Sequence, residues 1–148
     1  MQREQGHDQA QQSQTGGCQC GQVRYRLSAE PQALFICHCR ECQKQSASAF
    51  GISVIMASHA VTLLSGNLKS WTRATDSGRV LTCFFCPDCG TRLWHGDKDK
   101  APSVSIKGGS LDQPPDLSKA VHIWVNRKLS GVIVPPEAVC FAAEPPPD

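Results

Sequence analysis

Three cysteine motifs constrain this chain more strongly than any other feature of its sequence. They contain seven of its nine cysteines, in the order Cys18, Cys20, Cys37, Cys39, Cys42, Cys86 and Cys89. Cysteines one or two residues apart are typical of zinc sites. Aromatic residues make up only 6% of the 148 residues, so metal cross-links would supply stability that a small apolar core does not.

The two outer motifs predict one structural zinc site. Residues two apart on an extended backbone face the same way, so Cys18 and Cys20 can offer both sulfurs to one metal. Cys86 and Cys89 belong to the stretch C-P-D-C-G, in which proline and glycine favour the tight turn of a zinc knuckle. Four thiolates complete a tetrahedral site, which is structural because no coordination position stays open.

The central motif predicts a second zinc site of a different kind. It reads C-H-C-R-E-C and contains Cys37, Cys39 and Cys42. Three thiolates leave the fourth position free for water or an incoming ligand, which is the usual arrangement of a catalytic zinc. His38 alternates with two of these cysteines, so it should face the opposite way on an extended backbone.

A second partition of the cysteines stays open at this point. The pairs Cys39-x-x-Cys42 and Cys86-x-x-Cys89 also match a four-cysteine zinc ribbon, which would leave the other three motif cysteines without a ligand role. Iron–sulfur ligation fits less well, because the spacings differ from those of the usual clusters. Cys83 and Cys140 lie outside the motifs, and we expect both to be buried as small apolar residues.

Short alternating segments predict a mainly β fold. Val23, Tyr25 and Leu27, for example, alternate with polar residues as in a half-buried strand. The stretch Arg40–Ala49 lacks glycine and proline, which favours one short helix after the central cysteine motif. Strand patterns cover residues 22–28, 51–56, 60–64, 68–74, 79–85, 91–95, 103–107 and 121–126, and a short apolar run over residues 33–37 leads into the central motif.

One domain is expected over residues 16–143. Residues 1–15 are rich in glutamine and residues 144–148 read E-P-P-P-D, so both ends should be disordered. We find no signal peptide and no apolar run long enough for a membrane helix, and an odd cysteine count argues against a secreted disulfide scaffold. A cytoplasmic location is therefore expected. The formal charge of +2 gives no sign of a nucleic-acid partner, and no oligomeric state follows from the residues.

Taken together, the motifs resemble those of the glutathione-dependent formaldehyde-activating enzyme family, also called the centromere protein V family. The resemblance extends from about Gly16 to Phe141. The matching stretches are Gly16–Tyr25, Cys37–Lys44, Phe85–Trp94, Gly109–Asp112 and His122–Val125.

This resemblance implies two antiparallel sheets of the β-tent type and two zinc ions per chain. It places the structural zinc on Cys18, Cys20, Cys86 and Cys89, and the catalytic zinc on Cys37, Cys39 and Cys42. The implied activity is that of S-(hydroxymethyl)glutathione synthase, a carbon–sulfur lyase that adds the thiol of glutathione to formaldehyde or a related small aldehyde. Arg40 and Lys44 are candidates for attracting the carboxylates of glutathione, although solvated surface charge is the commoner role of such residues.

Two departures from the family pattern bear on the pocket. Family members usually carry glycine where this chain has Ala47, and usually carry a tryptophan where it reads Leu129-Ser130-Gly131-Val132. A non-catalytic alternative is a zinc-binding β-tent module for protein interaction or a chaperone-like role, in which both zinc sites would be closed to small thiols. A chromatin role would call for a basic extension, which this chain lacks.

Overall fold

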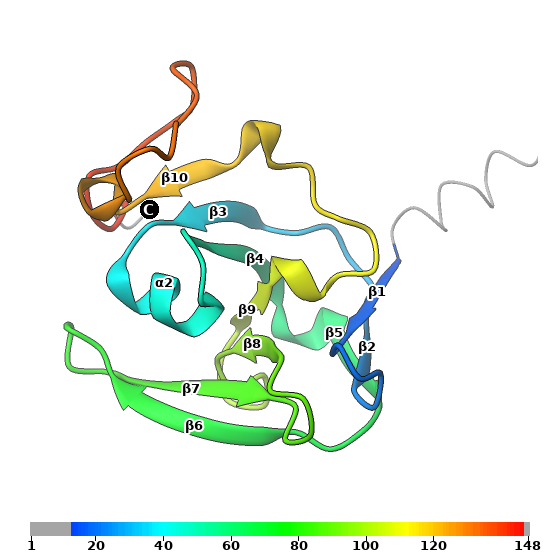
Figure 1. Cartoon of the computed structure of the whole chain (residues 1–148). Coiled ribbons are helices and arrows are strands. Elements are labelled where there is room, and N and C mark those ends of the chain that lie inside the picture. The colour runs from blue at the N-terminus through cyan, green and yellow to red at the C-terminus, as the bar shows by residue number, and fades with distance from the viewer. Residues whose placement is uncertain (1–12, 147–148) are drawn as a thin grey trace, which may run out of the picture.

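The computed structural model describes residues 13–146 and shows two β-sheets with one α-helix in that range (Figure 1). The small sheet has the order β1-β2-β5, formed by Gln14–Gly17, Arg24–Leu27 and Val61–Ser65. The large sheet has the order β10-β3-β4-β9-β8-β7-β6. Its strands are β10 Val121–Ile123, β3 Ala33–Cys37, β4 Gly51–Ala57, β9 Ser103–Lys107, β8 Arg92–His95, β7 Val80–Phe85 and β6 Lys69–Ala74.

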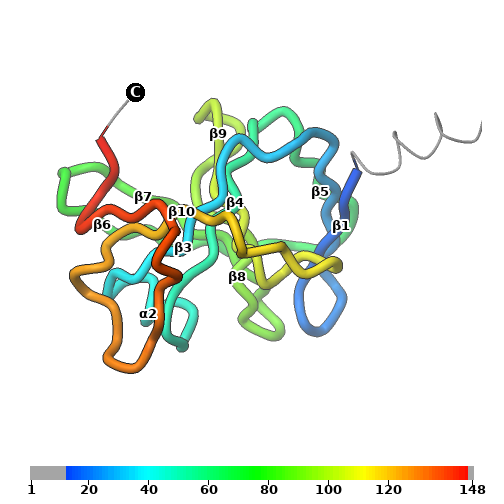
Figure 2. The backbone as a smooth tube through the Cα atoms, turned by 90° about the horizontal axis from the view of Figure 1, so that it is seen from above, coloured from blue at the N-terminus to red at the C-terminus, as the bar shows by residue number. Residues whose placement is uncertain are grey.

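Neighbouring strands run antiparallel except at one edge, where β10 lies parallel to β3. Short 3-10 helices connect the strands at Ser58–Ala60, Gly108–Ser110, Leu117–Lys119 and Val125–Arg127. The small sheet and the C-terminal segment lie at opposite ends of the molecule, with the large sheet between them (Figure 2). The prediction of a mainly β fold with two sheets and a short helix after the central motif is confirmed. No helix in residues 13–146 has the length and apolar character needed to cross a membrane.

The hydrophobic core fills the space between the two sheets. Tyr25 of β2 is fully buried, and its ring meets Trp94 of β8 edge-on with centroids 5.8 Å apart. The Tyr25 hydroxyl is paired with the Ser110 hydroxyl at 2.6 Å, so burial of this phenol leaves no polar atom unsatisfied. Val54 and Met56 of β4 join the same core. This packing joins the small sheet firmly to one face of the large sheet.

The other face of the large sheet carries polar residues and points away from this core. In β9, Val104 and Ile106 lie in the core, whereas Ser105 and Lys107 line a cleft on the opposite side. Successive residues of a strand point to opposite faces, so one sheet supplies both the core and the floor of a cleft.

The helix α2, Arg40–Ser46, stands beside the cleft and begins directly at the central cysteine motif. Cys39 is its N-cap, and its sulfur accepts a hydrogen bond from the amide of Cys42. The helix lies within the stretch Arg40–Ala49, as predicted, and it ends at Ser46 because Ala47 adopts a left-handed conformation with φ 51°. The Ala47 amide then donates to the carbonyls of the last turn and completes the cap.

The chain ends differ in part from the expected boundaries. The tail predicted over residues 1–15 falls mostly outside the described residues, but β1 already begins at Gln14, where it pairs with Leu27. Near the other end, the carboxylate of Glu144 accepts a hydrogen bond from the indole of Trp124 at 2.6 Å, which attaches the first residue of the predicted C-terminal end to the domain. Trp124 has φ 57°, so β10 ends at Ile123 rather than continuing to residue 126.

Candidate metal centres

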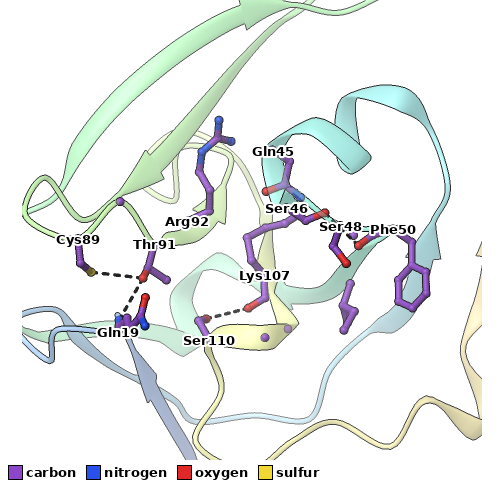
Figure 3. A pocket seen from close by; sticks show the side chains of 15 residues that line it. Gln19, Gln45, Ser46, Ser48, Phe50, Cys89, Thr91, Arg92, Lys107 and Ser110 are labelled. Carbon is purple, nitrogen blue, oxygen red and sulfur yellow. Dashed lines mark hydrogen bonds between the residues drawn. The ribbon is translucent and has the colours of Figure 1, made fainter.

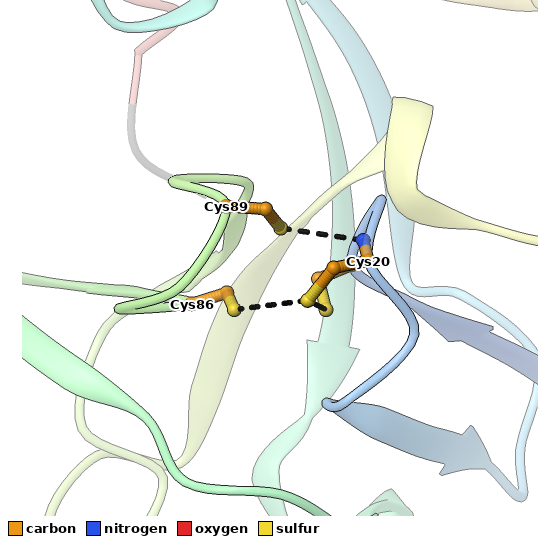
Figure 4. Close-up of side chains that lie close together, drawn as sticks. Cys20, Cys86 and Cys89 are labelled. Atoms are coloured by element: carbon orange, nitrogen blue, oxygen red, sulfur yellow. Dashed lines mark hydrogen bonds between the residues drawn. The ribbon is translucent and has the colours of Figure 1, made fainter.

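The outer cysteine motifs converge on one point. The sulfurs of Cys18, Cys20, Cys86 and Cys89 all lie within 4.8 Å of one another. The first two come from the turn after β1 and the other two from the knuckle between β7 and β8 (Figure 4). This group joins segments 66 residues apart in the sequence. The expected extended backbone at Cys18–Cys20 is wrong, because a turn closed by Gly21 N–H and Cys18 C=O brings the two sulfurs to 3.6 Å.

Hydrogen-bond donors surround the sulfurs of these four cysteines, which we call the outer cluster. The amides of Val23, Cys20 and Asp88 lie 3.2 to 3.4 Å from the sulfurs of Cys18, Cys89 and Cys86. The Thr91 hydroxyl is 3.3 Å from the Cys89 sulfur and is the main reason why the pKa of that thiol falls to about 5. Such donors stabilise the thiolate, the form in which cysteine binds metal, so these four residues fit a closed tetrahedral site.

The central motif forms a second, separate group of only three sulfurs. Cys37 ends β3, Cys39 caps α2 and Cys42 lies in its first turn, and their sulfurs lie within 4.8 Å of one another. Hydrogen bonds from the Cys37 and Cys42 thiols lower the pKa of Cys39, and the amide of Cys42 adds to the effect. Gly51 leaves room here, since a Cβ at that position would lie 3.3 Å from the Cys42 sulfur. These residues fit a metal with three protein ligands.

This central cluster opens into a cleft with a volume of about 540 Å³. The floor is formed by β3, β4, β8 and β9, and the walls come from α2, the β6–β7 hairpin and the C-terminal segment. Trp71, Leu81 and Ile123 supply apolar wall, and Glu144 with Pro145 lies at the C-terminal side. A cleft of this size beside a cluster of three cysteine sulfurs can admit a small organic molecule.

Positive charge is concentrated on the cleft floor. Lys107 is only 8% exposed, and its ammonium donates to the Ser53 hydroxyl at 3.2 Å. Burial lowers the pKa of this lysine. Arg92 donates to His95 Nε2 at 2.9 Å, which leaves the imidazole proton on Nδ1. Burial, together with Lys107, Arg92 and Arg73, lowers the pKa of His95 to about 3, so that this imidazole is neutral near pH 7.

Contacts across the mouth hold the β6–β7 hairpin against the rest of the cleft. Arg73 of β6 lies 3.9 Å from the carboxylate of Glu41 in α2. Trp71 of the same strand is half exposed, and the guanidinium of Arg92 lies 5.7 Å from its ring centre. Trp71 therefore forms part of the cleft wall.

A second cavity, which we call the side cavity, has a volume of about 480 Å³. It lies between the end of α2 and the knuckle that contains Cys89 (Figure 3). Ser46 and Ser48 line it from the helix side, and Thr91 from the knuckle side. Its lining and that of the cleft have three residues in common, which are Gln45, Arg92 and Lys107.

The structure distinguishes among the sequence-based hypotheses for the other residues. The zinc-ribbon grouping does not form, because Cys39 and Cys42 belong to one cluster and Cys86 and Cys89 to the other. His38 faces away from the central cluster as expected, is fully buried and pairs with His122 at 2.9 Å.

Two expectations about isolated cysteines differ in outcome. Cys83 is fully buried, as predicted. Cys140 is exposed, so the expectation for it is wrong; its sulfur lies 3.4 Å from the carbonyl of Ala138 in the C-terminal segment, outside the core.

The two residues expected to attract the carboxylates of glutathione, Arg40 and Lys44, differ in their position relative to the cleft. Lys44 lines the cleft, whereas Arg40 is exposed and lines neither cavity. Sequence analysis missed Arg92, His95 and Lys107. One signal for the lysine was present, because the strand pattern S-V-S-I-K alternates apolar residues with a polar face that ends in Lys107.

Comparison with known proteins relates this chain to a family, to a named relative and to a solved structure. Residues 13–127 match the family model described as glutathione-dependent formaldehyde-activating enzyme. A Halomonas elongata protein named "Putative glutathione-dependent formaldehyde-activating enzyme" is 28% identical over 141 residues, which cover 88% of this chain and 87% of that protein. A crystal structure of a Rhodobacter sphaeroides protein matches with a TM-score of 0.53 and 19% identity, covering 73% of this chain and 98% of that chain. That structural likeness supports the fold alone.

Proposed function

Because the chain belongs to the glutathione-dependent formaldehyde-activating enzyme family, we propose that it is a carbon–sulfur lyase of the S-(hydroxymethyl)glutathione synthase type. Its reaction in the forward direction adds the thiol of glutathione to formaldehyde or a related small aldehyde. One observation carries the proposal: three cysteine sulfurs lie within 4.8 Å of one another on the wall of a cleft with a cationic floor. We also infer a β-tent type of fold from the family.

Zinc is the metal that we propose for both clusters, two ions per chain. Cys18, Cys20, Cys86 and Cys89 would hold a structural ion, and Cys37, Cys39 and Cys42 would hold the ion at the cleft. A zinc ion bound by Cys37, Cys39 and Cys42 would act as a Lewis acid and would stabilise an added thiol as the thiolate.

The residues of the cleft would organise the two reactants. During the addition a carbon–sulfur bond forms, the π electrons of the carbonyl move to its oxygen, and that oxygen takes up a proton. Lys107 has three N–H donors, of which one is directed at Ser53, so the others can stabilise the developing oxyanion. Trp71 and Leu81 exclude water from one side of the cleft. Holding both reactants in one orientation lowers the entropic part of the barrier.

An exchange measurement tests this activity directly. Thiols and formaldehyde combine without an enzyme, so the rate of interconversion, rather than the yield, must be followed, for example by NMR exchange with ¹³C-formaldehyde and glutathione. We expect the protein to accelerate exchange and Cys39→Ser to abolish the acceleration while the protein stays folded. Full acceleration by the folded Cys39→Ser variant would sink the proposal.

We further propose that the protein works in the cytoplasm. None of its nine cysteines is in a disulfide, and seven of them form the two clusters. Thiols remain available to metals in a reducing compartment.

A further inference from the structure

One buried residue separates two cysteines of the central cluster. His38 lies between Cys37 and Cys39 in the chain and is fully buried. It is not among the residues that line the cleft or the side cavity. Because the peptide units of His38 are shared with its two neighbours, contacts that fix His38 also fix the backbone of both cysteines.

Both backbone polar groups of His38 are bonded to other elements. Its N–H donates to the carbonyl of Ile123 at 3.0 Å. Ile123 is the last residue of β10, which lies beside β3 at the edge of the large sheet (Figure 1). The carbonyl of His38 accepts a hydrogen bond from the side-chain amide of Gln43 in α2 at 2.8 Å. The backbone between the two cysteines is therefore held by β10 on one side and by α2 on the other.

The amide of Gln43 bridges two distant segments. The same NH₂ group that donates to His38 also donates to the carbonyl of Arg127 at 3.0 Å, across 84 residues. Both neighbours are carbonyl oxygens, which only accept, so the NH₂ group must face them and both of its hydrogens are used. Arg127 ends the 3-10 helix that follows β10. Gln43 thus connects the central motif to the segment after β10.

The imidazole of His38 adds a third contact to β10. Its Nε2 lies 2.9 Å from Nδ1 of His122, and the two rings stack with centroids 5.2 Å apart. Within residues 13–146, Nδ1 of His38 has no hydrogen-bond partner. A buried N–H without an acceptor costs more than an unpaired lone pair, so the proton lies on Nε2 of His38 and is donated to His122. His122 is therefore the acceptor that holds the His38 ring in place.

We propose that Gln43 and His122 are positioning residues for the metal of the central cluster, and that they act by holding His38 and with it Cys37 and Cys39. This inference rests on the proposed metal at this cluster, but not on the proposed reaction. A site with three protein ligands lacks the fourth bond of a closed site, so its grip on the metal depends more on how firmly the ligands are held. Gln43 and His122 line neither cavity, so they act without contacting a substrate.

A matched pair of substitutions on α2 tests the role of Gln43. Gln43→Met and Gln45→Met both replace an amide by an apolar side chain of similar length and helix propensity. Only the first removes hydrogen bonds, since the Gln45 side chain forms none within residues 13–146. The measurement is the rate of zinc transfer from the loaded protein to a chromogenic chelator. The phase that is missing in Cys42→Ser belongs to the central cluster. We expect Gln43→Met to release the central zinc about tenfold faster than the natural chain, with release from the outer cluster unchanged. Gln45→Met should match the natural chain at both sites.

A second pair of substitutions tests His122 in the same assay. His122→Leu removes the acceptor of the His38 ring, whereas the amide of His122→Asn places a polar atom where the imidazole has Nδ1 and can accept the same hydrogen bond. We expect His122→Leu to release the central zinc about tenfold faster than the natural chain, and His122→Asn to stay within about threefold of the natural rate. In cobalt-loaded protein, the ligand-field bands of the central site should shift in Gln43→Met and in His122→Leu, because they report the geometry of the ligands.

The possible results separate this inference from the proposed function. Release of the central zinc at the natural rate by Gln43→Met, or at equal rates by the two His122 variants, overturns the inference while the metal site stands. Equal acceleration at both clusters overturns it too, because it indicates a general loss of stability. If His122→Leu does not fold, the comparison of Gln43→Met with Gln45→Met decides alone. If the natural chain has no central phase, the proposed metal at the cleft fails and this inference fails with it.

Discussion

The Cys39 sulfur accepts a hydrogen bond from the backbone amide of Cys42 at 3.3 Å, so the N-cap of α2 is also a member of the central cysteine cluster. The same two residues thus begin the helix and offer sulfur to a metal. Folding of the helix and assembly of the cluster are coupled through this contact. Any change at Cys39 affects both, and suitable substitutions can separate the two effects.

Substituting Cys39 by serine or by alanine should separate capping from metal binding. Serine keeps a side chain that can cap the helix but is a poor zinc ligand, whereas alanine removes both functions. We expect both variants to lose the metal of the central cluster. In chemical unfolding, Cys39→Ala should be less stable than Cys39→Ser by about 1 kcal/mol. Equal stability, together with equal hydrogen exchange of the α2 amides, would show that Cys39 does not cap the helix.

The outer cluster should matter more for folding than the central one. It connects the turn after β1 to the β7–β8 knuckle, and Cys86 within it is fully buried. We expect Cys86→Ser to lower the thermal midpoint far more than Cys42→Ser does, because a structural metal contributes its binding energy to folding. Each variant should lose one equivalent of zinc. Cys140→Ser, at an exposed position outside both clusters, is the control and should keep both equivalents. If Cys42→Ser loses more stability than Cys86→Ser, the central cluster matters more for folding than the outer one, and the prediction is wrong.

Ala47→Gly should stabilise the protein. Ala47 has φ 51°, in the left-handed region that glycine enters without the Cβ clash of other residues. The expected gain in the free energy of unfolding is up to about 1 kcal/mol, reduced by the extra freedom of glycine in the unfolded chain. Ala49→Gly is the matched control, because Ala49 is not among the residues with positive φ, and it should bring no gain. A loss of stability in Ala47→Gly would contradict this interpretation of the helix end.

His95 should make the protein less stable in mild acid. Its pKa in the folded protein is about 3, below the ordinary value of 6.5, because the imidazole is buried near three cations. Below pH 6.5 the unfolded chain gains a proton that the folded chain does not, so the stability present above that pH is lost as the pH falls toward 3. The loss approaches about 1.4 kcal/mol per pH unit. Between pH 7 and pH 5, the stability of His95→Gln should therefore fall less steeply in urea unfolding than that of the natural chain.

Comparison with His59→Gln, a substitution at an exposed position, provides the control for that experiment. Parallel loss of stability in the natural chain and in His95→Gln would mean that His95 titrates normally and is not the buried neutral group described above.

Much of the architecture was predictable because its signals are local. Alternation in segments such as Arg24–Leu27 and Ser103–Lys107 marks strands, and the two cysteine spacings mark metal knuckles. The division of seven cysteines into four and three needed the fold, because Cys20 and Cys86 meet across 66 residues. Spacing alone also allowed the ribbon pairing.

The rest of the site depends on sheet order, which local patterns do not contain. Arg92 and His95 lie on β8, Lys107 lies on β9 and Trp71 lies on β6, and these residues share a cleft only because the strands take the order β9-β8-β7-β6. The backbone conformation at the end of α2 was also not predicted. The left-handed turn at Ala47 uses a residue type that gives no sequence signal for it.

The most direct test of the central claim is the absorption spectrum of the cobalt-substituted protein during titration with glutathione. If Cys37, Cys39 and Cys42 hold a metal that is open to a thiol, sulfur-to-cobalt charge-transfer absorption should rise and saturate, and Cys42→Ser should lose this response. An unchanged spectrum with both metals retained would contradict the claim. It would mean that the sites are closed to thiols and would favour a non-catalytic interaction module.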